Sequence, residues 1–143
     1  MDIIKAIAKS LDLGYQFGTY REINALFDRH DKTELPAVCE LMALKGSFEL
    51  KYESAKDNQA VCLLFLDLDQ KTVDSQKTGE IVDRMKAKAL EFLKAVTETQ
   101  RFESIDGTTL EYFTIVKQFD KCLTGIEITI PLNPGKAVCL GVS

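Results

Sequence analysis

The chain has 143 residues, 45% of them hydrophobic and 28% charged, and a formal net charge of −4 at pH 7. These values exclude a low-complexity chain and indicate one globular domain with enough residues for a core. The acidic balance also argues against a nucleic-acid partner, because phosphate backbones select clustered Lys and Arg. The densest basic group, Arg84, Lys86 and Lys88, is expected on the solvent-exposed face of a helix.

No segment of the sequence suggests contact with a membrane. A helix that crosses a bilayer needs about 20 apolar residues, whereas the longest apolar run, Ala60–Leu66, has the length of a strand. The start of the chain, Met1–Lys5, lacks the features of a signal peptide. We therefore expect a cytoplasmic protein.

The first part of the chain contains one readable helix. Helical spacing predicts it over residues 2–12, with Gly14 as its stop, from the apolar residues Ile3, Ile4, Ile7 and Leu11. Tyr15–Tyr20 alternates weakly, a pattern that is compatible with an edge strand but does not establish one. Residues 21–33 are ambiguous, because their apolar positions fit a helical turn and a short strand equally well.

Residues 35–67 have the pattern of consecutive strands. A strand is predicted over 37–44, after Pro36, and a second over Ser47–Glu53, where apolar and polar residues alternate strictly. The polar segment Ser54–Gln59 is predicted to be the turn, because it contains Asp57-Asn58. The chain is then expected to return as a buried strand over Ala60–Asp67.

A long amphipathic helix is predicted over Gly79–Glu98, with Thr78 as its N-cap. Steps of three and four place one set of apolar residues on a single face, which must be covered by a sheet or another helix. That set is Ile81, Val82, Met85, Ala89, Phe92, Leu93 and Val96.

A second hairpin is predicted to follow the long helix, with strands over 110–119 and 122–132. The order α-β-β-β-α-β-β indicates an α+β fold. In it, a single antiparallel sheet of about five strands, mixed at most, carries both helices on one face. We expect one domain over residues 1–143, with an N-terminal part over 1–34, a core over 35–132 and a loose tail over 133–143.

The sequence offers few candidates for chemistry. Asp67 and Asp69 are spaced so that both carboxylates of a strand end can meet one cation, but a polar strand exit that leads into a loop is the favoured interpretation. His30 is a potential general base, but a surface histidine in a charged segment is the simpler interpretation. We therefore predict no catalytic, cofactor-binding or metal-binding residues, and no cofactor.

The cysteines and aromatic residues are expected to be structural. The four cysteines have no Cys-x-x-Cys spacing and are predicted to be core thiols: Cys39, Cys62, Cys122 and Cys139. The aromatic residues of the strands are predicted to pack in the core rather than to stack on bases: Phe48, Tyr52, Phe65, Tyr112, Phe113 and Phe119.

Two stretches resemble small proteins from the structural gene blocks of tailed phages and prophages. The first is Glu34–Leu41, leading through Gly46-Ser47 to Phe65–Asp67, and the second runs from Ile81–Lys86 through Glu91–Leu93 to Gly125–Ile130. The order of elements over about residues 35–132 also resembles that of phage tail-terminator and neck proteins.

The resemblance implies a structural protein that has no active site and forms rings, commonly hexameric, at the end of the tail tube. The implied partners are further copies of the chain and other phage head–tail or tail-tube proteins, in the cytoplasm or the assembled virion. The family has no contact motif that matches this chain, so the resemblance assigns no functional residue.

Two other function classes stay open on the sequence alone. One is a small cytoplasmic module that binds a protein or a small ligand through the concave face of its sheet. The other is an enzyme whose site is assembled from scattered residues, with Asp67, Asp69 and His30 as the nearest candidates.

Overall fold

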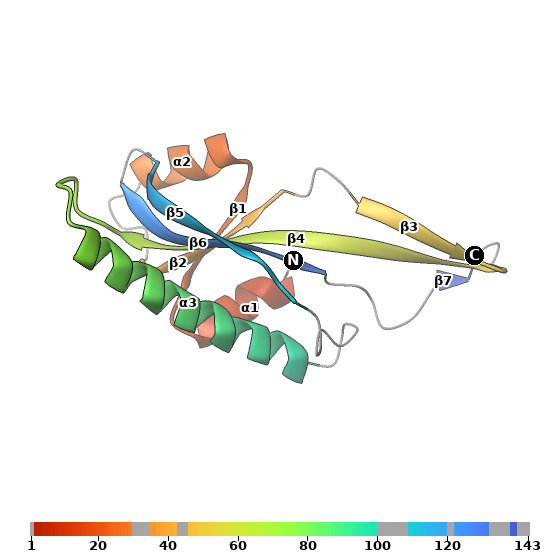
Figure 1. Ribbon diagram of the computed structural model, residues 1–143. Helices are drawn as coiled ribbons and strands as arrows, with labels where there is room; N and C mark the ends of the chain where they lie inside the picture. The colour runs from red at the N-terminus through yellow and green to blue at the C-terminus, as the bar shows by residue number, and fades with distance from the viewer. Residues whose placement is uncertain are drawn as a thin grey trace.

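The computed structural model describes residues 2–29, 35–42, 46–99, 109–119, 122–131 and 138–139. It consists of a body of helices on a sheet, from which a long pair of strands projects (Figure 1). The elements are α1 (Asp2–Ser10), β1 (Gly14–Gly18), α2 (Tyr20–Arg29), β2 (Ala37–Leu41), β3 (Gly46–Lys51), β4 (Ser54–Leu68), α3 (Ser75–Glu98), β5 (Tyr112–Gln118), β6 (Leu123–Pro131) and β7 (Val138–Cys139). The predicted α+β class is confirmed.

The sheet of the body has the strand order β1-β2-β4-β6-β5. β1 runs parallel to β2 at one edge, and the other neighbouring strands are antiparallel. The sheet is therefore mixed, which the sequence prediction allowed as an alternative to a purely antiparallel sheet. Within the described ranges, β3 and β7 pair only with the first part of β4. β7 lies within the segment predicted to be a loose tail and pairs with β4 at Ser54 and Ala55.

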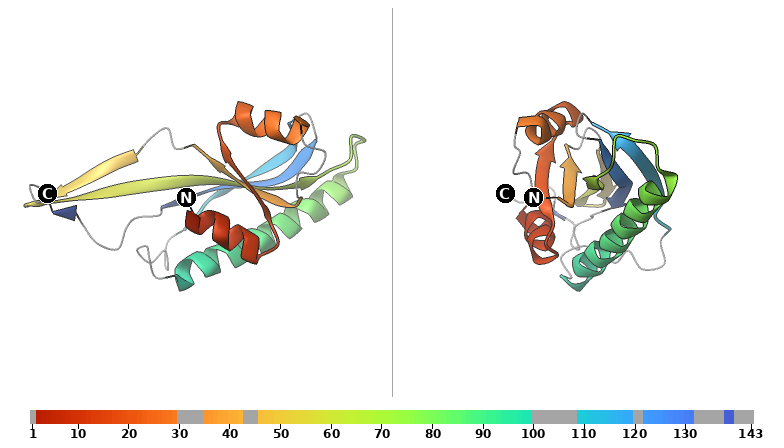
Figure 2. Two further views of the ribbon diagram at one scale, coloured as in Figure 1. Left: turned by 180° about the vertical axis from the view of Figure 1, so that it is seen from behind. Right: turned by 90° about the vertical axis from the view of Figure 1, so that its left-hand side faces the viewer.

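The long helix α3 covers one face of the sheet together with α1 (Figure 2). Its predicted apolar face is confirmed, since all of its members are buried except Leu93, which packs against the core as a partly buried side chain. The start of the helix was predicted too late. Asp74 is the N-cap, because its carboxylate accepts a hydrogen bond from Lys77 N, and α3 therefore begins at Ser75 and contains Gly79.

The two predicted helices lie on the same face of the sheet, as predicted, but a further helix that was not predicted, α2, covers the opposite face (Figure 2). Ile23 and Phe27 of α2 are fully buried in a second core with Leu64, Leu66 and other residues of the sheet. The observed order therefore contains a helix between the first two strands. Residues 21–29 take this form because two fully buried side chains, four positions apart, share one face of a helix.

The turn between β3 and β4 lies at Tyr52-Glu53 and not at the predicted Ser54–Gln59. Ser54–Gln59 instead forms the first part of β4, a strand of 15 residues. At about 3.3 Å per residue, β4 spans about 50 Å and runs from the projecting hairpin through the body. Asp and Asn are tolerated here, since Asp57 and Asn58 pair with β3 outside the body of the sheet.

Candidate functional site

The two carboxylates considered as a candidate cation site, Asp67 and Asp69, have separate partners within the protein. Asp67 Oδ2 lies 3.1 Å from Arg84 Nη1. Asp69 is buried, and its Oδ2 accepts hydrogen bonds from Thr78 Oγ1 at 2.8 Å and Thr124 Oγ1 at 2.7 Å. These contacts give both residues a structural role, because they tie the end of β4 to α3 and β6. His30 lies outside the described residues.

Asp69 is held as a carboxylate by its surroundings. Burial acts to raise its pKa, but hydrogen bonds from Thr124, Thr78 and the backbone N–H of Gln70, together with the ammonium of Lys117, lower the pKa below its ordinary value. A group of this kind does not act as a general acid near neutral pH. Among the described residues there is also no group of three or more His, Cys, Asp or Glu able to hold a metal ion.

A cluster that the sequence did not suggest lies on the face of the sheet that carries α2. Glu127 Oε1 accepts hydrogen bonds from Cys62 Sγ at 3.0 Å and from Tyr20 Oη at 3.3 Å. In the register, Cys62 pairs with Thr129, so Glu127 is its diagonal neighbour on β6. No local motif could reveal this contact, because it depends on the strand register.

The thiol of Cys62 is not an activated nucleophile. Burial, reinforced by the hydrogen bond to Glu127, raises its pKa to about 12. Burial and the charge of Glu127 likewise raise the pKa of Tyr20 to about 12. Both groups therefore stay protonated at neutral pH, whereas a nucleophilic cysteine needs its thiolate. Cys39 is fully buried as predicted, and its pKa is raised by burial to about 12.

The most distinctive surface feature is the hairpin that projects from the body. We call it the arm and define it as Gly46–Gln59, in which Gly46–Lys51 pairs with Ser54–Gln59. The turn residue Glu53 has φ 59°. The two-residue strand β7 pairs with the arm at Ser54 and Ala55. Figures 1 and 2 show that the arm extends well beyond the helices.

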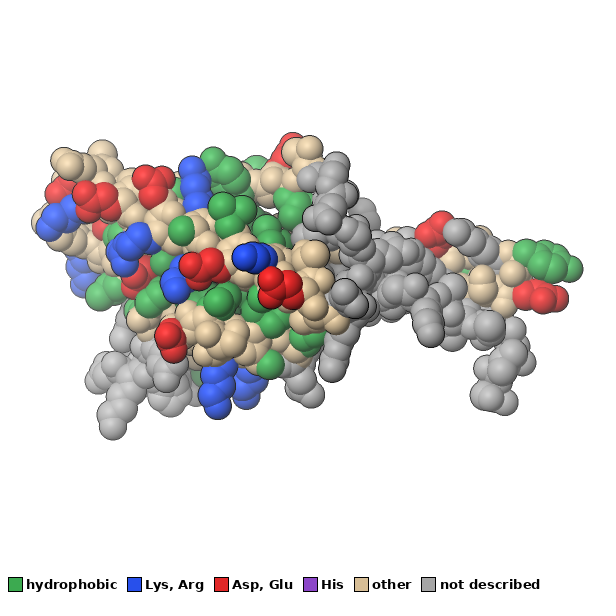
Figure 3. Space-filling model, turned by 90° about the horizontal axis from the view of Figure 1, so that it is seen from below, with side chains coloured by type: hydrophobic (Ala, Val, Ile, Leu, Met, Phe, Trp, Pro, Cys, Tyr) green, Lys and Arg blue, Asp and Glu red, His purple; other side chains and the backbone are tan. Residues whose placement is uncertain are grey.

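The apolar side chains of the arm are exposed to water. The exposed fractions are 74% for Phe48, 70% for Leu50 and 93% for Tyr52. Ser47 and Glu49, which alternate with them along β3, are exposed as well. No described part of the chain therefore covers either face of β3, and Figure 3 shows hydrophobic side chains at the free end of the arm beside an acidic one. Such exposed apolar groups mark interaction surfaces.

This exposure corrects the prediction for the aromatic residues. Phe65 is fully buried, as expected, and packs edge-on against Phe92 with ring centroids 5.5 Å apart. Phe119 is partly buried against the second core. The other four aromatic residues are exposed. Phe48 and Tyr52 lie on the arm, and Tyr112 and Phe113 lie on the edge strand β5. The alternation of apolar and polar residues in β3 correctly predicted that Phe48 and Leu50 share one face of the strand. It could not predict that this face is exposed to water.

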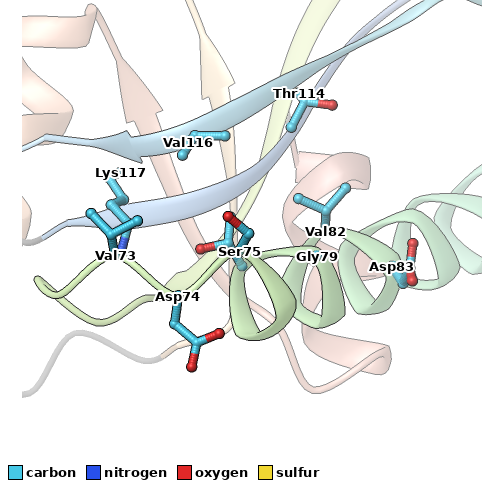
Figure 4. Close-up of a pocket in the computed structure, with 10 residues that line it drawn as sticks. Val73, Asp74, Ser75, Gly79, Val82, Asp83, Thr114, Val116 and Lys117 are labelled. Carbon is cyan, nitrogen blue, oxygen red and sulfur yellow. The ribbon is translucent and has the colours of Figure 1, made fainter.

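A groove lies at the end of the body where α3 begins and β5 ends (Figure 4). We call it the α3–β5 groove, and its cavity volume is about 440 Å³. Thr114 and Val116 of β5 face Val82 of α3 across it, and the loop residue Val73 lies at its end. Gly79 of α3 also lines the groove.

The groove is held in shape by Lys117. The Lys117 ammonium donates to the backbone oxygens of Gln70 and of Thr72, the latter at 2.9 Å, and lies 3.7 Å from Asp69 Oδ2. These contacts hold the loop that carries Val73, whose side chain is 90% exposed. Through Lys117, the buried carboxylate of Asp69 is thus linked to the loop that borders the groove.

Comparison with known proteins identifies no relative: no family model, curated protein or solved structure matches this chain. None of the helices that the structure describes is both long enough and apolar enough to cross a membrane.

Proposed function

We propose that this chain is a non-enzymatic assembly protein that acts through protein–protein contacts, and specifically a tail-terminator or neck component of a tailed phage or prophage. The observation that carries the proposal is the arm, which presents Phe48, Leu50 and Tyr52 to water. The phage assignment comes from the sequence resemblance. The assembly role has its support in the physical properties of the arm.

An arm of this kind favours a partner for two reasons. A two-stranded hairpin that no other layer covers is marginally stable in water, so a protein surface that packs on it stabilises it. Exposed strand edges and apolar side chains are also the features by which sheets join other chains. Ring formation through the arm would satisfy both.

Other features of the described residues support a role without catalysis. Asp67 and Asp69 have protein partners, and the Cys62 thiol has a raised pKa. The net charge of −4 gives no support to a partner made of nucleic acid. Structural roles are therefore sufficient to explain Asp67, Asp69 and Cys62.

The proposal is tested by measuring assembly of the purified chain. Size-exclusion chromatography with light scattering, over a range of concentrations, should show a closed oligomer, and electron microscopy should show it on the ends of purified tail tubes. The double variant Phe48→Ser, Leu50→Ser should lose the oligomer. Leu90→Ser is the matched control, since Leu90 is an exposed apolar residue of α3 outside the arm. A strict monomer that never decorates tube ends would contradict the proposal.

A second candidate is a small binding module. Its support is the α3–β5 groove, whose volume of about 440 Å³ lies within the usual range for small-ligand sites of about 300–1,000 Å³. The concave sheet face invoked from the sequence is a weaker candidate, because α2 covers part of it. A pull-down that recovers a specific host partner, with no self-assembly of the chain, would favour this function.

A further inference from the structure

We infer that the arms of two copies pair edge to edge, β3 against β3 in antiparallel orientation, with Leu50 of each copy opposite Leu50 of the other. This inference rests on the proposed assembly function and deepens it, because it names a second copy as the partner of the arm and states the register of the contact. Its basis is an open strand edge whose sequence is complementary to itself.

The outer edge of β3 is open to another strand. Among the residues that the structure describes, β3 pairs with β4 alone, and β7 takes the other side of β4 at Ser54 and Ala55 (Figure 1). The pairing of β3 with β4 runs from Gly46 to Lys51 without a register shift, and β3 contains no proline. Bulges and prolines are common means by which edge strands avoid other chains. Neither prevents β3 from accepting a partner strand.

The outward backbone groups of β3 belong to Phe48 and Leu50. The two-residue turn Tyr52-Glu53 closes the hairpin on the pair Lys51 and Ser54, whose backbone groups face each other. The N–H and C=O groups of successive residues in an antiparallel strand alternate in direction. Those of Lys51 therefore point to β4, and those of Leu50 and Phe48 point away. A partner strand can form its hydrogen bonds at these two residues.

Charge selects one register for two antiparallel β3 strands. Glu49 and Lys51 flank Leu50 in the sequence, so a two-fold axis at Leu50 places position 49 of each copy opposite position 51 of the other. An axis at Glu49 or at Lys51 would place like charges opposite each other, which destabilises a sheet. An axis at Phe48 would leave Lys51 and Tyr52 beyond the start of the partner strand. The axis at Leu50 also brings outward backbone groups together, as hydrogen bonding requires.

The same register joins the exposed apolar side chains of the two arms. Phe48, Leu50 and Tyr52 occupy every second position and are all exposed in the single chain. In the paired arms, Phe48 of each copy lies opposite Tyr52 of the other, and the two Leu50 residues lie opposite each other. Cross-strand pairs of aromatic residues stabilise sheets. Each two-stranded arm thereby becomes half of a four-stranded sheet, which is more stable than an isolated hairpin.

The length of the arm suits this contact. With the axis at Leu50, Glu53 at the tip of one arm lies opposite Ser47 of the other. β3 begins one residue earlier, at Gly46, and the pairing of β4 with the body begins at Ala60. The tip of each arm therefore ends before the body of its partner. Since the arm extends well beyond the helices (Figures 1 and 2), the two bodies lie at opposite ends of the paired arms.

A contact of this type is isologous, because both copies contribute the same surface. Isologous contacts close at two copies and do not propagate. Any larger closed assembly, including the ring of the proposed function, would then contain an even number of copies joined by a second surface.

Cysteine cross-linking tests the contact and its axis. Leu50→Cys is purified and oxidised, with the parent chain as the control for its own thiols. Cα atoms of a hydrogen-bonded antiparallel pair lie about 5.5 Å apart, a separation that a disulfide spans. We therefore expect a linked dimer in which mass spectrometry identifies residue 50 joined to residue 50.

Tyr52→Cys is the matched control, because it lies on the same arm and is also exposed. In the proposed register its two copies lie four residues apart along the paired strands, or about 13 Å, so it should not link to itself. An equal mixture of Phe48→Cys and Tyr52→Cys should give a peptide that joins residue 48 to residue 52. Neither variant should give this peptide alone.

Charge reversal tests the register independently. Glu49→Lys and Lys51→Glu should each raise the dissociation constant of the dimer about tenfold in sedimentation velocity, because like charges then lie opposite each other at two places. An equal mixture of the two variants should restore pairing, since a mixed dimer has opposite charges at both places. The restored pairing would also show that both variants are folded. Lys94→Glu is the control, because it makes the same charge change at an exposed position of α3, and it should dimerise like the parent.

The outcomes separate this inference from the proposed function. If the chain assembles but residue 50 does not link to itself and both charge variants assemble like the parent, the inference is wrong and the proposed function stands. If the parent is monomeric at every concentration and binds no tail tube, both are wrong. A monomer that binds tail tubes, and loses this binding in Phe48→Ser, Leu50→Ser, would assign the arm to a different protein and overturn the inference. A linked dimer that never binds tail tubes would support the inference and contradict the tail-terminator assignment.

Discussion

Asp69 links the end of β4 to the start of α3, and its ionisation should affect stability. Hydrogen bonds from Thr78 and Thr124, with Gln70 N and Lys117, outweigh burial and lower its pKa. A lowered folded-state pKa stabilises the protein above the ordinary carboxyl pKa, and this stability is lost as the pH falls through the folded value. We expect Asp69→Asn to cost about 1–3 kcal/mol at pH 7 in urea unfolding.

The pH dependence distinguishes this role from a simple packing defect. The parent should lose stability below about pH 4, and Asp69→Asn should lose less over the same range. Asp67→Asn is the control, because its partner Arg84 is 59% exposed and exposed pairs contribute about 0–1 kcal/mol. Equal acid sensitivity of the parent and Asp69→Asn would contradict the proposed network.

Cys62 should become more reactive when Glu127 loses its charge. Burial is the main cause of its raised pKa of about 12, and the carboxylate of Glu127 adds to it. Glu127→Gln removes the second contribution, so the thiolate fraction at pH 8.5 should rise, about tenfold for each unit of lowered pKa. The rate of modification by a chromogenic disulfide measures this, with Cys39, which is fully buried, as the slow internal reference. An unchanged rate would show that Glu127 does not control the thiol.

At the scale of single elements, two glycines should respond oppositely to alanine. A Cβ at Gly79 meets open space, so Gly79→Ala should stabilise α3 by about 0.5–1 kcal/mol. A Cβ at Gly125 would lie 1.7 Å from the backbone oxygen of Phe65, within the pairing of β4 and β6. Gly125→Ala should therefore cost about 3 kcal/mol or more. Thermal unfolding of both variants checks the prediction, and destabilisation by Gly79→Ala would contradict it.

The packing of α3 can be tested by placing charges on its buried face. Met85 and Phe92 are buried against the sheet, so Met85→Asp or Phe92→Asp should unfold the body by leaving an unpaired charge in the core. Leu90→Asp should change stability by about 0.5 kcal/mol or less, because Leu90 is exposed. If either core variant melts like the parent, α3 does not pack as described.

The contrast between α3 and α2 shows what periodicity can predict. The apolar face of α3 repeats over many turns, and the buried residues are those that the pattern selects. α2 has only 10 residues, too few for one period to be distinguished from another. Its helical form depends on the burial of Ile23 and Phe27 against the second face of the sheet, a tertiary contact that no local window contains.

At the scale of the whole molecule, the candidate surfaces were the least predictable part. The alternation of Phe48 and Leu50 predicts a strand with one apolar face, but that pattern is the same whether the face lies in a core or on a projecting arm. The turn signal Asp57-Asn58 also placed the end of the hairpin wrongly, within β4. The α3–β5 groove joins residues such as Val73 and Val116, which are distant in sequence and adjacent only after folding.

The arm should be the part of the molecule whose protection depends on assembly. Among the residues that the structure describes, it pairs only with itself and the two-residue β7, and such a hairpin opens far more often than a core strand. In hydrogen exchange, amides of Ser47–Gln59 should exchange quickly in dilute monomer and slowly in the oligomer, whereas those of Leu63–Leu66 should be protected in both. Tyr52→Ser should keep the arm in its fast-exchanging state at every concentration. Equal protection of the arm in monomer and oligomer would show that the arm is stable alone and that assembly uses other surfaces.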